Sequence, residues 1–269
     1  MSLLQGNAHK SALNPGERPR SSLRLIREGF PDRPAYGTGV SEAVLRRVAA
    51  GELDATVRLH RPARELAFSK QDRAAPGFER AVREARAAGF EPVVRLAGGR
   101  AAAFHEGTLA LAWASPAERP VAGTRERFQQ LAGIVTEALR GLGVDARVGE
   151  VAGEYCPGAW SVNARGRTKL AGIGQRLISG GAHVGAVIVV QGSELLRSAL
   201  EPAYAALELD WDPATVGSVE DEVPGATLDD VEAALVAELG RRFDLVEAEL
   251  DPATLALGEE LAAGHEALA

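Results

Sequence analysis

Apolar residues recur at helical spacing along several stretches of the chain, and glycines follow the points where they stop. Three such stretches are residues 41–50, 77–88 and 126–141. Ser41 can cap the first stretch, and a glycine can end each of them. The opposite side of each stretch is polar, so the pattern predicts three amphipathic helices.

Two further helices are predicted towards the C-terminus. Residues 227–239 are amphipathic and begin at Thr227. Asp251 can cap the last helix. Pro252 fits its first turn, because the backbone N–H that proline lacks would have no partner within the helix at that position.

Short stretches in which apolar and polar residues alternate, or in which β-branched residues dominate, predict strands between the helices. They are residues 55–59, 65–69, 92–97, 101–105, 108–114, 160–163, 167–172 and 186–190. Residues 164–166 turn a hairpin, and the uniformly apolar run 186–190 is typical of a buried strand. Helices over mixed sheets predict an α+β fold.

The chain divides into three parts by composition. Residues 1–22 are rich in Asn, Gly, Pro, Ser and Arg and predict a flexible lead, because few apolar side chains are present to offset the entropy of ordering. Residues 23–222 form the main domain, and residues 223–269 form a helical extension packed on it.

Composition narrows the classes of protein that fit. The 269 residues are 46% hydrophobic and 25% charged, and no apolar run approaches the roughly 18 residues of a membrane span. A net charge of −7 disfavours a nucleic-acid partner, which requires clustered positive charge. The polar N-terminus lacks the apolar core of a secretory signal, so we expect a cytoplasmic protein without a membrane partner.

Common catalytic and metal motifs are absent from the sequence. The histidines, among them His105 and His183, have no metal-ligand spacing, and a single cysteine cannot supply a metal site alone. We therefore predict no metal. The sequence also lacks a Gly-x-Ser-x-Gly elbow and a phosphate loop.

A glycine loop joins two predicted strands at Gly98, Gly99 and Arg100. One interpretation is a turn that needs a positive φ angle. The other is a site where backbone N–H groups approach an anion or a thin acyl chain, with Arg95 and Arg100 supplying charge. The loop by itself leaves both open.

Cys156 and Lys169 are the candidates for chemistry. Cys156 lies in a loop containing Pro157 and Gly158, and is either a small buried apolar residue or an accessible nucleophile. A nucleophile requires a nearby positive charge or base that stabilises the thiolate. Lys169 follows in an apolar strand, and is either a surface lysine or a group that orients an acyl carbonyl.

These motifs together resemble the biotin/lipoate protein-ligase superfamily. The resemblance rests on the segment 94–100 followed by Phe104 and His105, on Cys156, and on the segment 166–176. The Gly-Gly-Arg loop and the loop cysteine are most similar to the cysteine-dependent octanoyltransferases among the lipoate-protein ligase A-like members. The chain departs from the usual pattern at Val94, where a first arginine is common.

The resemblance implies a central mixed β-sheet with a smaller sheet, flanked by helices, and makes residues 23–222 the catalytic domain. It implies that Cys156 accepts the acyl group and that Lys169 contacts the acyl carbonyl. The residues that it places around the substrate are Arg95, Gly98, Gly99, Arg100, His105, Gly172 and Gln175.

The implied activity is transfer of an octanoyl or lipoyl group through a thioester on Cys156, without a cofactor. Acyl carrier protein would be the donor. The acceptor would be a lysine of a lipoyl carrier domain, either the glycine-cleavage H protein or a 2-oxoacid dehydrogenase subunit.

Two other functions fit the same residues. An ATP-dependent lipoate-protein ligase would make lipoyl-adenylate, would need ATP and Mg, and would leave Cys156 structural. A non-catalytic protein would keep the pocket only to bind a fatty acid or a carrier domain. The requirement for ATP separates the first alternative from the transferase.

Overall fold

The computed structural model describes residues 20–267, so residues 1–19 of the predicted lead lie outside the described residues. The strands of the large sheet are β1 (Ser22–Ile26), β2 (Thr56–His60), β6 (Thr108–Ala117), β7 (Ala146–Val148), β8 (Val162–Ala164), β9 (Thr168–Ile178), β10 (Gly180–Val189) and β11 (Asp244–Glu247). The small sheet contains β3 (Glu65–Phe68), β4 (Glu91–Val94) and β5 (Ala102–Phe104).

The helices are α1 (Pro34–Ala49), α2 (Lys70–Arg73), α3 (Phe78–Ala87), α4 (Thr124–Gly141), α5 (Ser193–Ala206), α6 (Val219–Glu222), α7 (Leu228–Arg242) and α8 (Pro252–Ala262). Two short 3-10 turns, η1 (Pro213–Thr215) and η2 (Ala263–His265), complete the elements of this part of the chain.

The large sheet is mixed, in the order β11-β1-β2-β6-β10-β9-β8-β7. β1 runs parallel to both of its neighbours, and the remaining pairs are antiparallel. The small sheet has the order β4-β3-β5. This arrangement confirms the predicted α+β class with a central mixed sheet and a smaller sheet.

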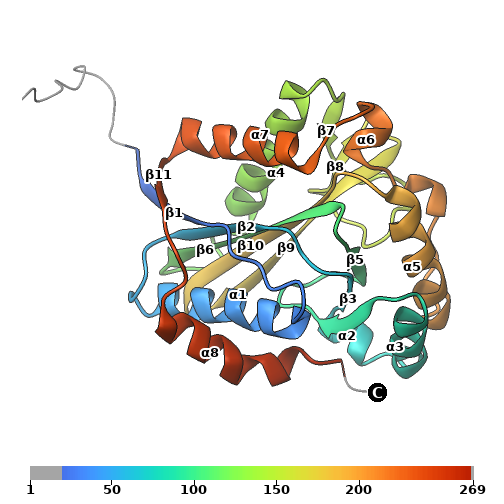
Figure 1. Cartoon of the computed structure of the whole chain (residues 1–269), viewed down its shortest axis with the longest axis horizontal. Coiled ribbons are helices and arrows are strands. Elements are labelled where there is room, and N and C mark those ends of the chain that lie inside the picture. The colour runs from blue at the N-terminus through green and yellow to red at the C-terminus, as the bar shows by residue number, and fades with distance from the viewer. Residues whose placement is uncertain (1–19, 268–269) are drawn as a thin grey trace, which may run out of the picture.

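Helices cover both faces of the large sheet (Figure 1). α4 and α7 pack on one face, and α1 packs on the other with α8 outside it. α3 and α5 pack against each other and cover the small sheet, which lies beside α1. The small sheet and α1 therefore form one layer over the same face of the large sheet.

The predicted start of the first helix is wrong. α1 begins at Pro34, and Ser41 lies inside it instead of capping it. The buried side chains of Tyr36 and Val40 extend the apolar face of the helix towards its N-terminus. Gly39, in this first part of the helix, has a packing role, because a Cβ there would lie 2.5 Å from the carbonyl oxygen of Gly258 in α8.

Other element predictions are confirmed. α4 spans the predicted amphipathic stretch, and Thr227 forms a capping box with Asp230 at the start of α7. The Asp251 carboxylate caps α8, with Pro252 in its first turn. No local sequence pattern predicted α5, which contains Pro202 within the helix.

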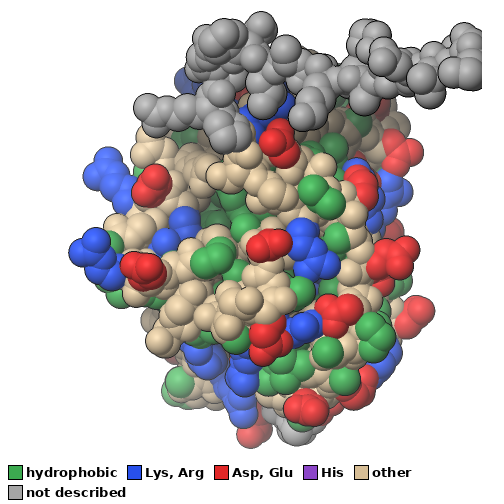
Figure 2. Space-filling view, turned by 90° about the vertical axis from the view of Figure 1, so that its left-hand side faces the viewer, with side chains coloured by type: hydrophobic (Ala, Val, Ile, Leu, Met, Phe, Trp, Pro, Cys, Tyr) green, Lys and Arg blue, Asp and Glu red, His purple; other side chains and the backbone are tan. Residues whose placement is uncertain are grey.

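Two charged residues of the edge strand β11 form ion pairs. Arg20 pairs with Asp244, and Arg27 pairs with Glu247. Figure 2 views this side of the molecule, where positive and negative side chains are interspersed over the surface. Such charges oppose edge-to-edge pairing of strands. Among residues 20–267, no helix combines the length and the apolar character needed to cross a membrane.

Candidate active site

A cavity of about 130 Å³ lies between the large sheet and the layer formed by α1 and the small sheet. Its floor includes small residues on three strands: Ala110 and Ala112 of β6, Gly185 of β10, and Gly172 and Gly174 of β9. Val187 of β10 lines the cavity between Ala110 and Gly172, and Nε2 of His183 would lie 2.8 Å from a Cβ on Gly185. Because the small side chains among them reach no further than a methyl group, they leave room for a thin chain in this part of the cavity. Cys156, Arg95 and Lys169 line the cavity as well.

The Cys156 loop holds its thiol in a fixed position. The backbone of Cys156 has a φ angle of 43°, in the left-handed region that favours glycine. Its N–H donates to the hydroxyl of Tyr204 at 2.8 Å, and that hydroxyl donates to the carbonyl of Ala101 at 2.9 Å. Strained backbone that neighbouring groups hold in place is common at functional sites.

Positive charge and N–H groups surround the sulfur. The backbone N–H of Arg100 donates to Sγ at 3.2 Å, and Nη1 of Arg95 lies 3.7 Å from Sγ. Burial raises the pKa of the Cys156 thiol, but the charges of Arg95 and Lys169 and the hydrogen bonds lower it by more. The pKa therefore falls below its ordinary value, which favours the nucleophilic thiolate.

Replacement of Arg95 by glutamine is expected to raise the pKa of Cys156, because the nearest positive charge is lost. The rate of alkylation by iodoacetamide should then rise with pH at a higher midpoint than in the wild type. Since the chain has one cysteine, intact-mass measurements report that rate directly. Arg83→Gln, at an exposed position of α3, is the control, and an equal midpoint in all three proteins would contradict the role of Arg95.

Gly99 is required where it faces the sulfur. Its φ angle is 113°, and a Cβ there would lie 2.8 Å from Sγ of Cys156. At Gly98, a Cβ would meet no atom within 4 Å, and the φ angle is not in the left-handed region. Thus the loop needs glycine at position 99, because of its φ angle and because of its close approach to the sulfur, but not at position 98.

Gly99→Ala is expected to displace the sulfur and to lower the free energy of unfolding by about 1–2 kcal/mol, the cost of a side chain in the left-handed region. The alkylation rate of Cys156 should fall with it. Gly98→Ala is the matched control and should change both quantities little. Equal effects of the two substitutions on urea unfolding and alkylation would show that the Gly99 contact is unimportant.

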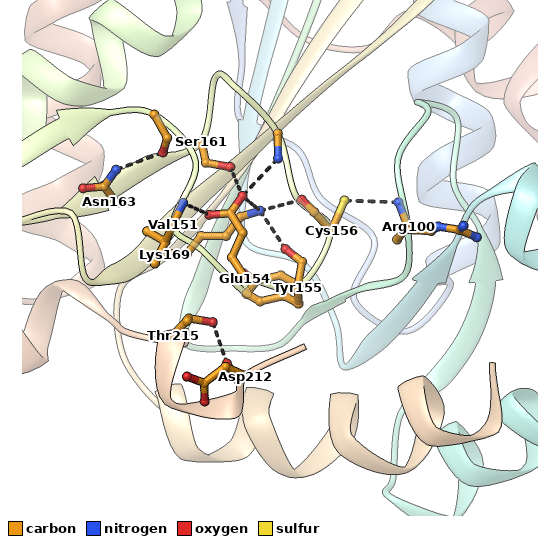
Figure 3. A network of polar contacts seen from close by, with 12 residues as sticks. Arg100, Val151, Glu154, Tyr155, Cys156, Ser161, Asn163, Lys169, Asp212 and Thr215 are labelled. Carbon is orange, nitrogen blue, oxygen red and sulfur yellow. Dashed lines mark hydrogen bonds and ion pairs between the residues drawn. The ribbon is translucent and has the colours of Figure 1, made fainter. Parts of the chain in front are cut away.

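Lys169 is fully buried and its ammonium group has three acceptors (Figure 3). Nζ donates to the Glu154 carboxylate at 3.0 Å, to the carbonyl of Tyr155 at 2.9 Å and to the carbonyl of Cys156 at 2.7 Å. All three protons of the ammonium group are thus used to hold the loop that carries the cysteine.

Glu154 organises the rest of this loop (Figure 3). Its buried carboxylate accepts hydrogen bonds from the backbone N–H groups of Val151 and Gly158 and from the hydroxyl of Ser161. With the Lys169 contact, one carboxylate therefore joins three points of the segment between α4 and β9 to Lys169 in β9. Bonds to a carboxylate from several donors are stronger than neutral ones.

The structure brings most of the predicted site residues together. Arg95, Gly172, Cys156 and Lys169 line the cavity, and Gly99 contacts the sulfur. Gly98 donates its N–H to the carbonyl of Gln175.

The side chains of three predicted residues do not line the cavity. The Arg100 guanidinium pairs with buried Asp72 at 3.3 Å, and only its backbone N–H meets the sulfur. The Gln175 side chain bonds to Arg127 and to the carbonyl of Thr124 at the start of α4. His105 is buried outside the residues that line the cavity, where its Nδ1 accepts the N–H of Gly107.

Sequence reasoning missed Glu154, Tyr204 and Arg58. Glu154 lies two positions before Cys156, and an acidic residue so near a candidate nucleophile was a usable signal. Tyr204 and Arg58 reach the site from α5 and β2, and nothing in the local sequence marks them. In residues 20–267, no group of three or more His, Cys, Asp or Glu side chains is placed to hold a metal ion.

Comparison with known proteins supports one family. Residues 33–240 match the model of the lipoyl protein ligase A/B catalytic domain. The octanoyl-[GcvH]:protein N-octanoyltransferase of Geobacillus kaustophilus is 29% identical over 161 residues, which are 60% of this chain and 56% of that protein. The chain thus spans a little over half the length of that relative. The transferase of the same name from Oceanobacillus iheyensis is 25% identical over 228 residues, 81% of each chain.

Solved structures share the fold. Lipoate-protein ligase A bound with ATP superposes with a TM-score of 0.74 at 20% identity, over 90% of this chain and 94% of that chain. A bipartite lipoate-protein ligase from Thermoplasma acidophilum, solved in a study of its lipoylation system and E2 lipoyl domain, gives 0.68 at 18% identity over 91% and 93%.

Proposed function

Because the chain belongs to the lipoyl protein ligase A/B catalytic-domain family, we propose that it transfers an octanoyl or lipoyl group to a protein lysine through a thioester on Cys156. The observation that carries the proposal is the sulfur beside Arg95 and the Arg100 N–H, in the lining of a cavity whose floor includes small residues. A lowered thiol pKa, a charged neighbour and a thin cavity are what an acyl-accepting cysteine requires.

In the first step, the Cys156 thiolate attacks the acyl carbonyl of the donor. A bond forms between Sγ and the carbonyl carbon, the bond from that carbon to the donor's sulfur or nitrogen breaks, and the leaving thiol or amine takes a proton from solvent. Negative charge develops on the carbonyl oxygen in this step, and the Arg95 guanidinium beside the sulfur is placed to stabilise it.

In the second step, the amine of the acceptor lysine attacks the thioester. The new amide bond forms, the bond to Sγ breaks, and the amine proton passes to solvent. The same lowered thiol pKa makes Cys156 a better leaving group than an ordinary thiol. Arg95 thus assists both steps by favouring the thiolate.

In this proposal the main role of Lys169 is to hold the loop that carries Cys156, and not to contact the substrate. Its three N–H bonds already have acceptors, so contact with an acyl carbonyl requires exchange of one of them. We therefore assign to Lys169 the positioning of Cys156, with the carbonyl contact implied by the resemblance as a further prediction.

The test is intact-mass spectrometry of the wild type beside Cys156→Ser, mixed with octanoyl-acyl carrier protein or with octanoylated GcvH and without ATP. The relatives' name specifies octanoyl-GcvH, so this carrier is tried beside acyl carrier protein. An adduct on the wild type alone, discharged by a lipoyl domain of a 2-oxoacid dehydrogenase or by GcvH, supports the proposal. Carrier modification that needs ATP, Mg and free lipoate in both proteins would overturn it in favour of the ligase.

A further inference from the structure

Hydrogen bonds join the Cys156 loop and the glycine loop into a closed circuit. The Arg100 N–H donates to Sγ of Cys156 at 3.2 Å, as Figure 3 shows. Ala101, the next residue along the chain, accepts the hydroxyl proton of Tyr204 at its carbonyl oxygen, at 2.9 Å. That hydroxyl in turn accepts the Cys156 N–H at 2.8 Å. The circuit therefore passes through the sulfur, its N–H donor and one side chain of α5.

Tyr204 is the member of the circuit that belongs to neither loop. Its hydroxyl has one proton to donate, which goes to Ala101, and it accepts one from Cys156. A single oxygen atom thus ties the two loops to each other. Because both bonds use backbone groups, the tie acts on the course of each loop and not on one side chain.

The core holds the Tyr204 hydroxyl in place. The side chain is 2% exposed, and its aromatic ring packs against Trp211 with the two centroids 5.3 Å apart. Helix α5, which carries Tyr204, packs against α3 and β5. Tyr204 is not among the residues that line the cavity, so it can influence an acyl group only through Cys156.

Other contacts fix the Arg100 side of the circuit. Nη1 of Arg95 donates to the Arg100 carbonyl at 2.9 Å, and the Arg100 guanidinium pairs with buried Asp72 at 3.3 Å. The N–H that meets the sulfur is therefore held independently of the cysteine. Whether the sulfur stays in front of it depends on the contacts of Cys156 itself.

The backbone of Cys156 is held from both ends. Its carbonyl accepts Nζ of Lys169, and its N–H is bonded to Tyr204. Its φ angle of 43° lies in the left-handed region, which is unfavourable for a residue with a Cβ. Loss of the Tyr204 bond therefore lets the N-terminal side of this residue relax to an ordinary φ angle, and this relaxation moves Sγ away from the Arg100 N–H.

We propose that Tyr204 is a positioning residue of the acyl transfer, and that its hydroxyl holds the Cys156 sulfur against the Arg100 N–H. The inference rests on the proposed function for the reaction that it assists. In the first step this N–H favours the attacking thiolate, and in the second step it favours the same thiolate as the leaving group. Tyr204 assists both steps without touching the substrate.

Tyr204→Phe tests this role, because it removes the hydroxyl and keeps the aromatic ring. The readout is the rate of alkylation of Cys156 by iodoacetamide against pH, followed by intact mass. The charges of Arg95 and Lys169 next to the sulfur remain in the variant. We expect the midpoint of the profile to rise by at least about half a unit, part of the shift that loss of a hydrogen bond to a charged group produces.

The same variant should divide the kinetic constants of acyl transfer. We expect kcat to fall by at least about threefold, the factor that corresponds to half a pH unit. The KM for the acyl donor should stay within about twofold of the wild-type value, because Tyr204 does not line the cavity. A rise in KM with kcat unchanged would overturn the inference.

Tyr36→Phe is the matched control. Tyr36 is also buried, and its hydroxyl also donates to a backbone carbonyl, that of Leu255 at 3.4 Å, but it does not line the cavity. Its alkylation midpoint should equal that of the wild type. An unchanged midpoint in Tyr204→Phe would overturn the inference, as would an equal rise in both variants, because the latter would show a general loosening of the fold.

A measurement on the wild type decides the matter if Tyr204→Phe does not fold. Isotope labelling of cysteine gives one backbone amide signal, because the chain has one cysteine. Its hydrogen exchange should be at least about a hundredfold slower than that of an exposed amide, since the bond to Tyr204 lies in the core. Exchange as fast as that of an exposed amide would overturn the inference.

Failure of the proposed function is distinguishable from failure of the inference. The first appears as no thioester on wild-type Cys156 in the intact-mass assay with an acyl donor. Thioester formation by the wild type, combined with an unchanged alkylation profile in Tyr204→Phe, would overturn the inference alone.

Discussion

Cys156→Ala is expected to lower the rate of acyl transfer by at least about 10⁴-fold, because removal of a covalent nucleophile leaves only substrate binding to assist the reaction. The measurement is transfer of octanoate from a carrier to a lipoyl domain, followed by intact-mass spectrometry. The fold should persist, because Cys156 is partly exposed and lines the cavity.

Thermal unfolding of Cys156→Ala provides the control for this loss. An unchanged midpoint shows that chemistry, and not folding, was removed. Alkylation of the wild type by iodoacetamide should give the same loss, since Cys156 is the chain's one cysteine. Transfer that survives both treatments would show that Cys156 is structural and would favour the ATP-dependent alternative.

Lys169→Met is expected to lower the free energy of unfolding by about 3–5 kcal/mol, because it leaves the Glu154 carboxylate buried without its counter-charge. Urea unfolding measures this change. Transfer should fall as well, since Lys169 holds the carbonyls of Tyr155 and Cys156. Glu154→Gln should destabilise the protein for the same reason in reverse.

The double variant Lys169→Met/Glu154→Gln tests the pairing. Because neither charge is then buried alone, it should be less destabilised than the sum of the two single variants. Arg147→Met is the matched control, because Arg147 and Asp145 form an exposed ion pair whose loss should leave the unfolding free energy unchanged. Additive effects of the two buried substitutions would mean that Lys169 and Glu154 do not act as a pair.

Much of the fold was predictable because local patterns carry it. The amphipathic stretch of α4 and the caps at Thr227 and Asp251 mark helices by rules that involve only neighbouring residues. α5 was not predicted because Pro202 is a helix breaker in the local rules, and its tertiary packing against α3 outweighs that preference.

Only those residues of the candidate site that lie in recognisable sequence motifs were predictable. Cys156, Lys169 and the glycine loop were selected from the sequence, and the structure brings them together: the loop meets the Cys156 sulfur, and the Lys169 ammonium binds the Cys156 carbonyl. Arg58 and Tyr204 could not be selected, because their importance comes from burial and from partners remote in sequence. Long-range partners of this kind are not encoded in any local pattern.

The position of β1, inside the sheet and next to the edge strand β11, has a consequence for how the protein assembles. β1 pairs with β2 on one side and with β11, more than 200 residues later, on the other. Contacts between such distant segments form slowly, because a long loop must close first. During synthesis, one edge of β1 therefore stays open until β11 has emerged from the ribosome. In that interval the open edge is a place where a nascent chain can pair wrongly or meet a chaperone.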